Sequence, residues 1–496
     1  MSDVARFQVA TARARVFILY TGGTIGMEEE MRGGVRTLTP QPMGRLVQHL
    51  ERVSSETGIE IEARALTGLF DSSSMGPPQW QQIADVIEEV YESCDGIVVL
   101  HGTDTLAYTA SALSFMLENL GKPIVLTGSQ LPISHVRTDA TQNLVNAVCV
   151  AGWRATSLPC IPEVVVVFAD SILRGCRTRK VSASSLRGFV SPNYPALGTI
   201  GERIEVHLEH LRAAPESRVP FCVVRGLSTE VLDLSLFPGF SADHLARILV
   251  EPSEIKAVLL RTYGAGNAPE DPEFLDVITD VAKKAKVIVN VTQCLEGMIQ
   301  MGLYGASTGL LERGVVSGLD MTPEAALTKL MWALQNRSGA DLISFMQTDQ
   351  RGEQSENLFD LAYGACPDGT SHYSATRRPD ARLTVPRIGA AILRVVGLEA
   401  EGEGRVRVML NHAAPMRAGE NDDPRVLVDL RTDELRPEVT VRVRAVRVRR
   451  LIGDGDARLD VVGSSGVKVR FQGLHLTLYA RVHHQVLPGT PGPSSS

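Results

Sequence analysis

Two threonines flank a pair of glycines near the start of the chain, in the segment TGGTIG from Thr21 to Gly26. The apolar run RVFILY precedes them, so the glycines would turn sharply at the end of a buried strand. The segment has neither the G-x-G-x-x-G order nor the G-K-[ST] of a P-loop, which argues against a phosphate site. A threonine hydroxyl at this turn could attack a carbonyl carbon, provided that a base accepts its proton. A plain turn with a capping threonine is the other interpretation.

The segment HGTDTLAYTAS places three polar residues, Thr103, Asp104 and Thr105, between a second apolar run and a helical pattern. Backbone N–H groups at the start of a helix favour negative charge, so an oxyanion could be stabilised here. Asp104 could bind a substrate ammonium through a charge-assisted pair, or it could simply cap the helix.

A threonine could be deprotonated by an amine where no histidine is available. Lys180 follows the run VVVVF after a turn that contains Arg174, Arg177 and Arg179. Three guanidiniums that pointed inward would depress the pKa of the lysine and favour the neutral amine. Arginines in such turns are more often solvated or paired with acids.

A loop of hydroxyl groups follows Asp71, in LFDSSSMGPPQW, where a Pro-Pro pair marks the start of a helix. Ser72 and Ser73 could hold a carboxylate through their hydroxyl and N–H groups. A serine-rich helix cap explains the pattern equally well.

Short apolar runs alternate with amphipathic helical patterns over the first 350 residues, which predicts a mostly parallel α/β sheet. The strand candidates are RVFILY, GIVVLH, PIVLTG, EVVVVFA, KAVLLRTYG and KVIVNVTQ. The carboxyl ends of neighbouring parallel strands form the crevice where ligands bind. The polar segments that follow these strands should therefore lie close together.

The patterns divide the chain into parts. We expect an α/β domain over residues 14–214, a second α/β domain over 215–356 and a linker over 357–385. Seven short runs of alternating apolar residues then predict a small all-β domain over 386–486, and residues 487–496 read as a disordered tail.

Composition points to a soluble protein that does not bind nucleic acid. The net charge is −7, and the last 140 residues carry 20 basic and 16 acidic side chains without a known nucleic-acid motif. No apolar run is long enough to span a bilayer and no secretory signal is evident, so we expect a cytoplasmic location. The seven cysteines are widely spaced without a C-x-x-C, which argues against disulfides and zinc and favours buried free thiols.

Five segments, in this order, resemble the L-asparaginase family, and the cytoplasmic bacterial kind in particular: TGGTIG, DSSSM, HGTDT, TGSQ-P-I and RGCRTRK. The resemblance covers about residues 14 to 350. It implies two α/β domains, hydrolysis of L-asparagine to L-aspartate and ammonia through an acyl-threonine, and no metal or organic cofactor. The last 140 residues have no counterpart in the short bacterial enzymes, and their partner is unknown.

The resemblance also implies a role for each matching residue. Thr21 is the nucleophile, Lys180 moves a proton through the hydroxyl of Thr103, and the N–H of Thr103 helps to form the oxyanion site. Asp104 is part of this cluster and binds the α-ammonium. The α-carboxylate is held by Asp71, Ser72 and Ser73.

Three further residues take their roles from the resemblance. Tyr304 would orient Thr21, because the loop after TGGTIG lacks the tyrosine that relatives often carry there. Asn267 would reach the site of a neighbouring subunit, which implies a homodimer or a homotetramer. Arg261 stands where cytoplasmic relatives bind a regulatory asparagine.

Two alternatives remain open. One is the glutaminase-like subunit of a transfer-RNA amidotransferase, which has an extra domain before the TGGT segment. The other is a binding protein that senses asparagine without hydrolysing it, which the missing loop tyrosine favours.

Overall fold

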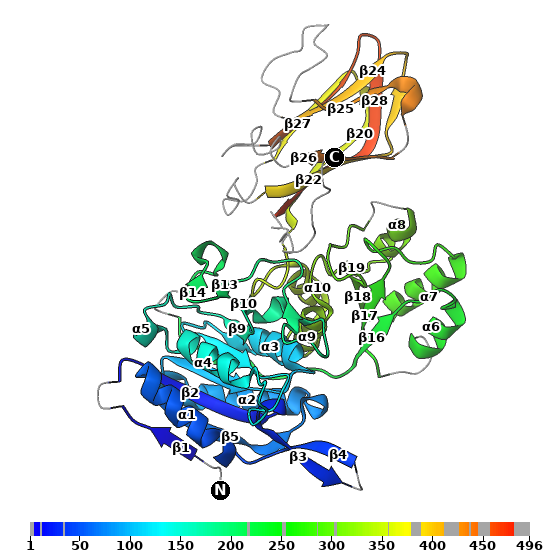
Figure 1. Cartoon of the computed structure of the whole chain (residues 1–496). Helices are drawn as coiled ribbons and strands as arrows, with labels where there is room; N and C mark the ends of the chain where they lie inside the picture. Colours follow the sequence, from blue (N-terminus) through cyan, green and yellow to red (C-terminus); the bar gives the residue numbers. More distant parts are fainter. Residues whose placement is uncertain are drawn as a thin grey trace, which may run out of the picture. The chain divides into compact units, whose positions relative to one another are not determined.

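The structure is a computed structural model of the whole chain (Figure 1). It describes residues 4–9, 12–32, 35–215, 219–249, 254–284, 286–301, 305–355, 357–377, 388–410, 426–435, 438–444 and 457–480. The chain divides into two compact units, the first ending at Gln354 and the second running from Ser355 to Val482.

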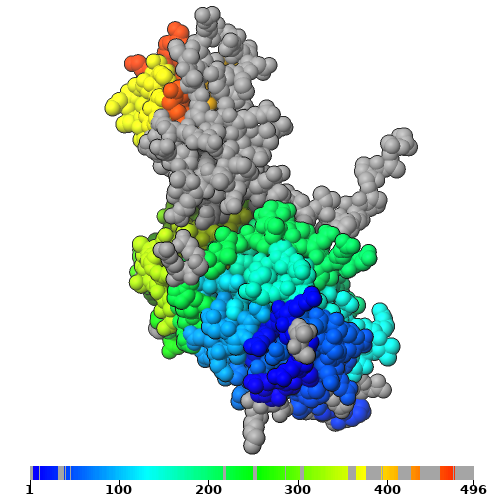
Figure 2. All heavy atoms as spheres, turned by 90° about the vertical axis from the view of Figure 1, so that its left-hand side faces the viewer, coloured from blue at the N-terminus to red at the C-terminus, as the bar shows by residue number. Residues whose placement is uncertain are grey.

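The first unit contains a nine-stranded sheet with the order β1-β5-β2-β6-β8-β9-β10-β13-β14. Its parallel centre consists of β5 (Glu60–Phe70), β2 (Arg15–Gly22), β6 (Gly96–Leu100), β8 (Ile124–Thr127) and β9 (Val164–Phe168). The antiparallel strands at its two ends are β1 (Val4–Phe7), β10 (Ser171–Arg174), β13 (Gly198–Ile200) and β14 (Ile204–Val206). In the space-filling view, the dark blue residues of the N-terminal part lie at the surface, as expected near an edge strand (Figure 2).

Helices cover both faces of this sheet. They are α1 (Gly44–Thr57) and α4 (Ala140–Ala151) on one face, and α2 (Pro77–Val90) and α3 (Leu106–Met116) on the other. The consecutive residues Ile18 and Leu19 of β2 are both fully buried, and they belong to different apolar clusters. Successive side chains of a strand point to opposite faces, so a continuous apolar run is what a strand covered on both sides requires. The predicted mostly parallel α/β sheet is thus confirmed.

The second sheet of the first unit is parallel throughout. Its strands are β16 (Val231–Ser235), β17 (Ala257–Thr262), β18 (Val287–Thr292) and β19 (Val316–Ser317). The helices on its two faces are α6 (Ala242–Leu249) and α7 (Pro272–Lys283), then α9 (Pro323–Asn336) and α10 (Gly339–Gln347).

Short elements complete the first unit. They are β3 (Met27–Arg32), β4 (Val35–Pro40), β7 (Leu117–Glu118), β11 (Arg179–Lys180), β12 (Phe189–Val190), β15 (Cys222–Val223), α5 (Trp153–Thr156) and α8 (Gly305–Glu312). Strand β15 pairs with β7, which follows α3 directly. The chain therefore still contacts the first α/β part after residue 215, where the sequence placed the boundary, and the second sheet begins at Val231.

The second unit is a pair of antiparallel sheets around one apolar cluster. One sheet contains β20 (Asn357–Thr370), β28 (Lys468–Ala480), β22 (Ile388–Val396), β26 (Glu438–Arg444) and β23 (Glu399–Glu401). The other contains β21 (His372–Arg377), β27 (Ala457–Gly463), β24 (Arg405–Leu410) and β25 (Val426–Arg431). Within the described residues this unit is all β, as predicted.

The linker predicted over 357–385 is wrong for its first part. Residues 357–370 and 372–377 form β20 and β21, which pair with β28 and β27. This stretch contains glycines and polar residues, which are typical of a linker, so its local sequence does not predict strands. Pairing with strands far along the chain stabilises β20 and β21. The rest of the linker, residues 378–385, and the tail predicted over 487–496 lie outside the described residues.

All seven cysteines are free thiols, as predicted, although their burial differs. Cys94 and Cys176 are buried, whereas Cys294 is exposed. No helix among the described residues is long and apolar enough to cross a membrane.

Candidate active site

The glycine pair brings the ends of β2 and β6 together. These strands are parallel neighbours, with Tyr20 opposite Leu100 at the last paired position. A Cβ atom at Gly23, where φ is +85°, would lie 2.3 Å from the backbone nitrogen of Gly102. Only glycine fits there, both because of this contact and because φ is positive. The turn after β2 therefore packs against the loop that carries Thr103.

Thr21 is fully buried at the end of β2. Its hydroxyl donates a hydrogen bond to the carbonyl of Leu100, with Oγ1 2.9 Å from the oxygen. This hydrogen bond fixes the Thr21 side chain against the neighbouring strand β6. A carbonyl oxygen cannot take the proton, so a base elsewhere has to act if Thr21 is a nucleophile.

Thr103, Asp104 and Lys180 form one cluster. The Nζ atom of Lys180 lies 2.9 Å from Oγ1 of Thr103 and 2.7 Å from Oδ1 of Asp104. Thr103 is buried, whereas the Asp104 side chain is 64% exposed and so accessible to a ligand. These distances show that the three side chains lie together, and their roles in a reaction stay predictions.

The serine loop docks on this cluster. Ser72 is buried, its Oγ accepts a hydrogen bond from the N–H of Asp104 at 3.3 Å, and its carbonyl accepts one from Thr105 at 2.7 Å. Asp71 accepts hydrogen bonds from both the N–H and the hydroxyl of Ser73, each at 3.0 Å. The segment is therefore a capped turn. It also contacts the backbone of Asp104 through the Ser72 hydroxyl.

Gln130 joins the site, although no role for it was predicted. Its Oε1 lies 3.5 Å from Oγ1 of Thr103, and its Nε2 donates to the carbonyl of Ser185 at 2.9 Å. Gln130 follows β8, the next parallel strand after β6. The rule that residues after parallel strands converge could have identified it from the SQLPIS segment.

The three arginines near Lys180 are paired with acids, which is the more common of the two arrangements that the sequence left open. Arg174 binds Glu163 with Nε 2.5 Å from Oε2, and Arg177 binds Asp320 at 2.8 Å. Arg179 lies 3.9 Å from Glu324, whose pKa is raised by burial. A guanidinium that is neutralised by a carboxylate contributes little field at a third group.

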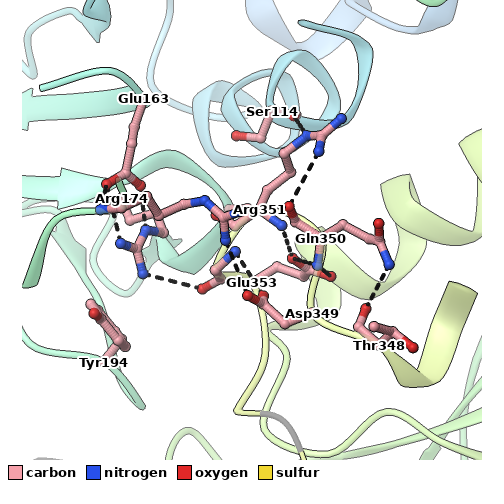
Figure 3. A network of polar contacts seen from close by, with 12 residues as sticks. Ser114, Glu163, Arg174, Tyr194, Thr348, Asp349, Gln350, Arg351 and Glu353 are labelled. Atoms are coloured by element: carbon pink, nitrogen blue, oxygen red, sulfur yellow. Dashed lines mark hydrogen bonds and ion pairs between the residues drawn. The ribbon is translucent and has the colours of Figure 1, made fainter. Parts of the chain in front are cut away.

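The turn of residues 349–353 holds the loop that carries Lys180. The carbonyl of Gly352 accepts hydrogen bonds from Nε of Arg177 at 2.7 Å and from Nη1 of Arg174 at 3.4 Å. Figure 3 shows this turn beside Arg174 and its partner Glu163. The position of Lys180 thus depends on residues at the very end of the first unit.

Two carboxylates, the fully buried Glu353 and the partly exposed Asp349, organise that turn (Figure 3). Glu353 accepts hydrogen bonds from the N–H groups of Gln350 and Arg351, and its Oε1 lies 2.5 Å from Nζ of Lys329. Burial alone would raise the pKa of Glu353, but Lys329 and these hydrogen bonds hold it below its usual value. Burial and the charge of Glu353 raise the pKa of Asp349 to about 7.

The remaining predicted residues do not join this cluster in the described structure. Arg261 is the last residue but one of β17 in the second sheet, and its guanidinium binds Asp233, with Nε 2.7 Å from Oδ1. Asn267 is half-buried, and its Oδ1 has no hydrogen-bond partner among the described residues. Tyr304 lies outside the described residues. No group of three or more His, Cys, Asp or Glu side chains in the described ranges is arranged to hold a metal ion.

Family models match most of the first unit. The model described as "Asparaginase, N-terminal" matches residues 15–212, and "Glutaminase/Asparaginase C-terminal domain" matches residues 230–344. These two ranges contain the second sheet and all strands of the nine-stranded sheet except β1.

Individual proteins agree with these models. L-asparaginase 1 of Escherichia coli (strain K12) is 39% identical over 344 residues, which cover 68% of this chain and 97% of that protein. A glutamyl-tRNA(Gln) amidotransferase subunit of Sulfolobus acidocaldarius is 31% identical over 70% of this chain and 76% of its own length. The crystal structure of L-asparaginase I from Vibrio cholerae matches with a TM-score of 0.61 and 39% identity, covering 69% of this chain and 99% of that one. The chain belongs to the asparaginase family.

Proposed function

We propose that the chain hydrolyses L-asparagine to L-aspartate and ammonia through an acyl-threonine intermediate. The observation that carries the proposal is the position of the Lys180 ammonium, 2.9 Å from the hydroxyl of Thr103, which follows β6, and β6 is the parallel neighbour of β2, which carries Thr21. A primary amide is a poor electrophile, and formation and hydrolysis of an ester divide its high barrier into two lower ones.

In the first step the hydroxyl oxygen of Thr21 attacks the side-chain amide carbon of asparagine. Thr21 loses its hydroxyl proton as the C–O bond forms, and the nitrogen gains one proton as the C–N bond breaks, so the Thr21 proton replaces the one that the Lys180–Thr103 pair passes to the departing ammonia. Lys180 donates a hydrogen bond to Oγ1 of Thr103, and the Thr103 hydroxyl, which donates to Oε1 of Gln130 at 3.5 Å in the structure, would turn to the leaving nitrogen. Lys180 and Thr103 can therefore pass a proton to ammonia as it departs.

In the second step water attacks the ester on Thr21 and releases aspartate. The same pair can work in reverse, with Thr103 taking a proton from the water and passing it to Lys180. The backbone N–H of Thr103 would stabilise the oxyanion in both steps. Tyr304 is proposed to orient Thr21 and to help in moving its proton.

The charges around the site suggest how the substrate backbone binds. Asp104 is an exposed carboxylate and suits the α-ammonium. A second carboxylate, Asp71, would repel the α-carboxylate, so we assign that group to the hydroxyl proton of Ser72. Asp71 instead accepts from the N–H and the hydroxyl of Ser73 and fixes the turn.

Ammonia release from asparagine tests the proposal. The wild-type chain should release ammonia, and Thr21→Ala, Thr103→Ala and Lys180→Ala should each lower the rate by about 10²–10⁴, as at other acyl-transfer sites. With hydroxylamine present, an acyl-threonine would also yield the hydroxamate of aspartate. A wild-type chain that binds asparagine without releasing ammonia would instead be a sensor, and one that acts only on glutamine would favour the amidotransferase-like alternative.

We further propose that the chain acts as a homodimer or homotetramer in the cytoplasm. The resemblance at Asn267 supports shared sites, and seven free thiols suit a reducing compartment. Light scattering of the purified chain would test the first point, and cell fractionation the second.

A further inference from the structure

A buried histidine lies directly behind the candidate site. His101 is fully buried after β6, and its Nδ1 is 2.7 Å from the carbonyl oxygen of Gly102. Its Nε2 is 2.9 Å from Oγ1 of Thr109 on α3. Trp80 of α2 donates from Nε1 to the same Oγ1, also at 2.9 Å. Three side chains from separate elements thus form one hydrogen-bonded chain that ends on a peptide.

The direction of this chain follows from its two ends. The indole N–H of Trp80 can only donate and the Gly102 carbonyl can only accept. Nδ1 of His101 must therefore carry a proton. Burial lowers the pKa of His101 to about 4, so the ring is neutral at physiological pH and Nε2 is free to accept from Thr109. Hydrogen bonds run from Trp80 to Thr109, to His101 and finally to Gly102.

The carbonyl at the end of the chain belongs to the peptide whose N–H is that of Thr103. A hydrogen bond to an amide oxygen draws electron density from the nitrogen and makes the N–H a stronger donor, and linked hydrogen bonds reinforce one another. An oxyanion is stabilised best by donors that are fixed and polarised before the reaction.

The peptide is also fixed by its surroundings. Gly102 packs between the turn after β2 and the serine loop, because a Cβ atom at this position would lie 2.5 Å from Oγ of Ser72 and 3.2 Å from Cα of Gly23. The Ser72 hydroxyl accepts from the next N–H, that of Asp104. The Gly102–Thr103 peptide therefore has little room to rotate, so the N–H of Thr103 keeps one direction.

We infer that His101 is a positioning residue for the reaction: its Nδ1–H, aligned by Thr109 and Trp80, orients and polarises the Gly102–Thr103 peptide so that the N–H of Thr103 can bind the oxyanion. The inference rests on the proposed function, because it concerns the rate of amide hydrolysis. It assigns His101 no contact with the substrate.

Two neutral substitutions distinguish the hydrogen bond from His101 to Gly102 from the packing of the His101 ring. In His101→Asn the side-chain amide nitrogen takes the place of Nδ1 and can still donate to Gly102. In His101→Gln the amide reaches the position of Nε2, so Thr109 keeps a partner and Gly102 loses its donor. Both variants leave a small cavity, so both should lose stability. His101→Gln should lose about 2- to 10-fold in kcat at nearly unchanged KM, while His101→Asn should stay within about twofold of the wild type.

Nuclear magnetic resonance of the wild-type chain tests the same inference without substitution. The ¹⁵N shifts of His101 should report a neutral ring with the proton on Nδ1. The amide proton of Thr103 should move upfield in His101→Gln, and less so in His101→Asn.

Several outcomes would overturn the inference: a proton on Nε2 in the wild type, an equal loss of kcat in both variants, or no loss in either. If both variants fail to fold, Thr109→Val takes their place, since it removes the donor to Nε2 and should lower kcat by a similar factor. A wild-type chain that does not hydrolyse asparagine contradicts the proposed function instead, and the resonance measurements still decide whether the hydrogen-bonded chain exists.

Discussion

The ammonium of Lys180 and the hydroxyl of Thr103 are in hydrogen-bond contact at 2.9 Å, although 77 residues separate them in the chain. Thr103 follows β6, whereas Lys180 lies in β11, which is outside the nine-stranded sheet. The contact thus joins the crevice of the sheet to a loop that is held from the other side by the turn of residues 349–353.

Replacement of Lys180 by methionine should strongly lower kcat and leave the fold intact. Methionine keeps the length of the side chain and removes the proton donor, so we expect kcat for asparagine to fall by about 10²–10⁴. The Lys180 side chain is 18% exposed, and its removal leaves the exposed Asp104 in contact with water. The measurement is ammonia release at saturating asparagine.

Lys256→Met is the matched control, since Lys256 also pairs with a carboxylate, Glu230, and belongs to the second sheet region. It should retain wild-type kcat. Equal activity in both variants would remove Lys180 from the reaction.

Asp104→Asn should raise KM for asparagine more than it lowers kcat. Loss of a charge-assisted hydrogen bond to the α-ammonium costs about 1.5–3 kcal/mol, which is about 10- to 150-fold in affinity. The substrate analogue succinamate lacks the ammonium, so its KM should be similar in the wild type and the variant. A variant that weakens both substrates equally would show that Asp104 acts through Lys180 and not through the ammonium.

The sequence was sufficient to identify the residues that follow parallel strands. Thr21 lies at the end of β2, and Thr103 and Asp104 follow its neighbour β6, as expected because a continuous apolar run predicts a strand buried on both faces and the ends of such strands meet. Their roles stay predictions. Lys180 was proposed as the amine that follows the run VVVVF, and its role in moving a proton came from the resemblance, since the two-residue strand β11 has no pattern of its own.

The partners of charged residues could not be predicted. Arg174 and Arg177 are close to Lys180 in sequence, yet their contacts are Glu163 and Asp320, which come from other elements. Strands β20 and β21 were missed for a similar reason, because their pairing partners, β28 and β27, come about 100 residues later in the chain. Both the ion pairs of the arginines and the pairing of these strands depend on residues far away in the chain, and local composition does not predict such contacts.

Acid should destabilise the first unit partly through His101. Its pKa is lowered by burial from 6.5 to about 4, so the unfolded chain binds a proton on this ring at a higher pH than the folded chain does. The contribution of neutral His101 to stability is complete above pH 6.5 and decreases as the pH falls toward 4, by about 3 kcal/mol in total. Tryptophan fluorescence in urea, at pH 7 and pH 4.5, measures this effect, because Trp80, Trp153 and Trp332 all lie in the first unit.

His101→Asn should be less stable than the wild type at pH 7 and should show a smaller loss between the two pH values. His135→Asn, at an exposed position, is the control and should keep the wild-type difference. If His101→Asn has the same pH dependence as the wild type, His101 is not the group that titrates.

Glu353→Gln should be strongly destabilising. Lys329 and Glu353 have side chains that are 0% exposed, and the substitution would leave the Lys329 ammonium without its carboxylate. Breaking a buried ion pair from one side costs about 3–5 kcal/mol. Asp280→Asn breaks the exposed pair with Lys283 and should cost less than about 1 kcal/mol. The double variant Glu353→Gln/Lys329→Met should recover part of the loss, and a double variant no better than the single one would argue against an uncompensated charge.

Whether a chain without the second unit is active should depend on the residue at which it is truncated. A chain that ends at Ser355 keeps the complete turn of residues 349–353, in which Gly352 binds Arg177 and Glu353 binds Lys329. A chain that ends at Thr348 loses the turn and leaves Lys329 and Arg174 without contacts that they make in the first unit.

These two truncated chains differ by seven residues that contribute no side chain to the Thr103–Lys180 contact, so their comparison isolates the support of the Lys180 loop. We expect the longer one to hydrolyse asparagine within about threefold of the full chain, because the second unit has its own apolar cluster. The shorter one should unfold at a lower urea concentration and lose most of its activity. Equal activity in both would mean that the loop is held without the turn, whereas loss of activity in both would assign a supporting role to the β unit itself.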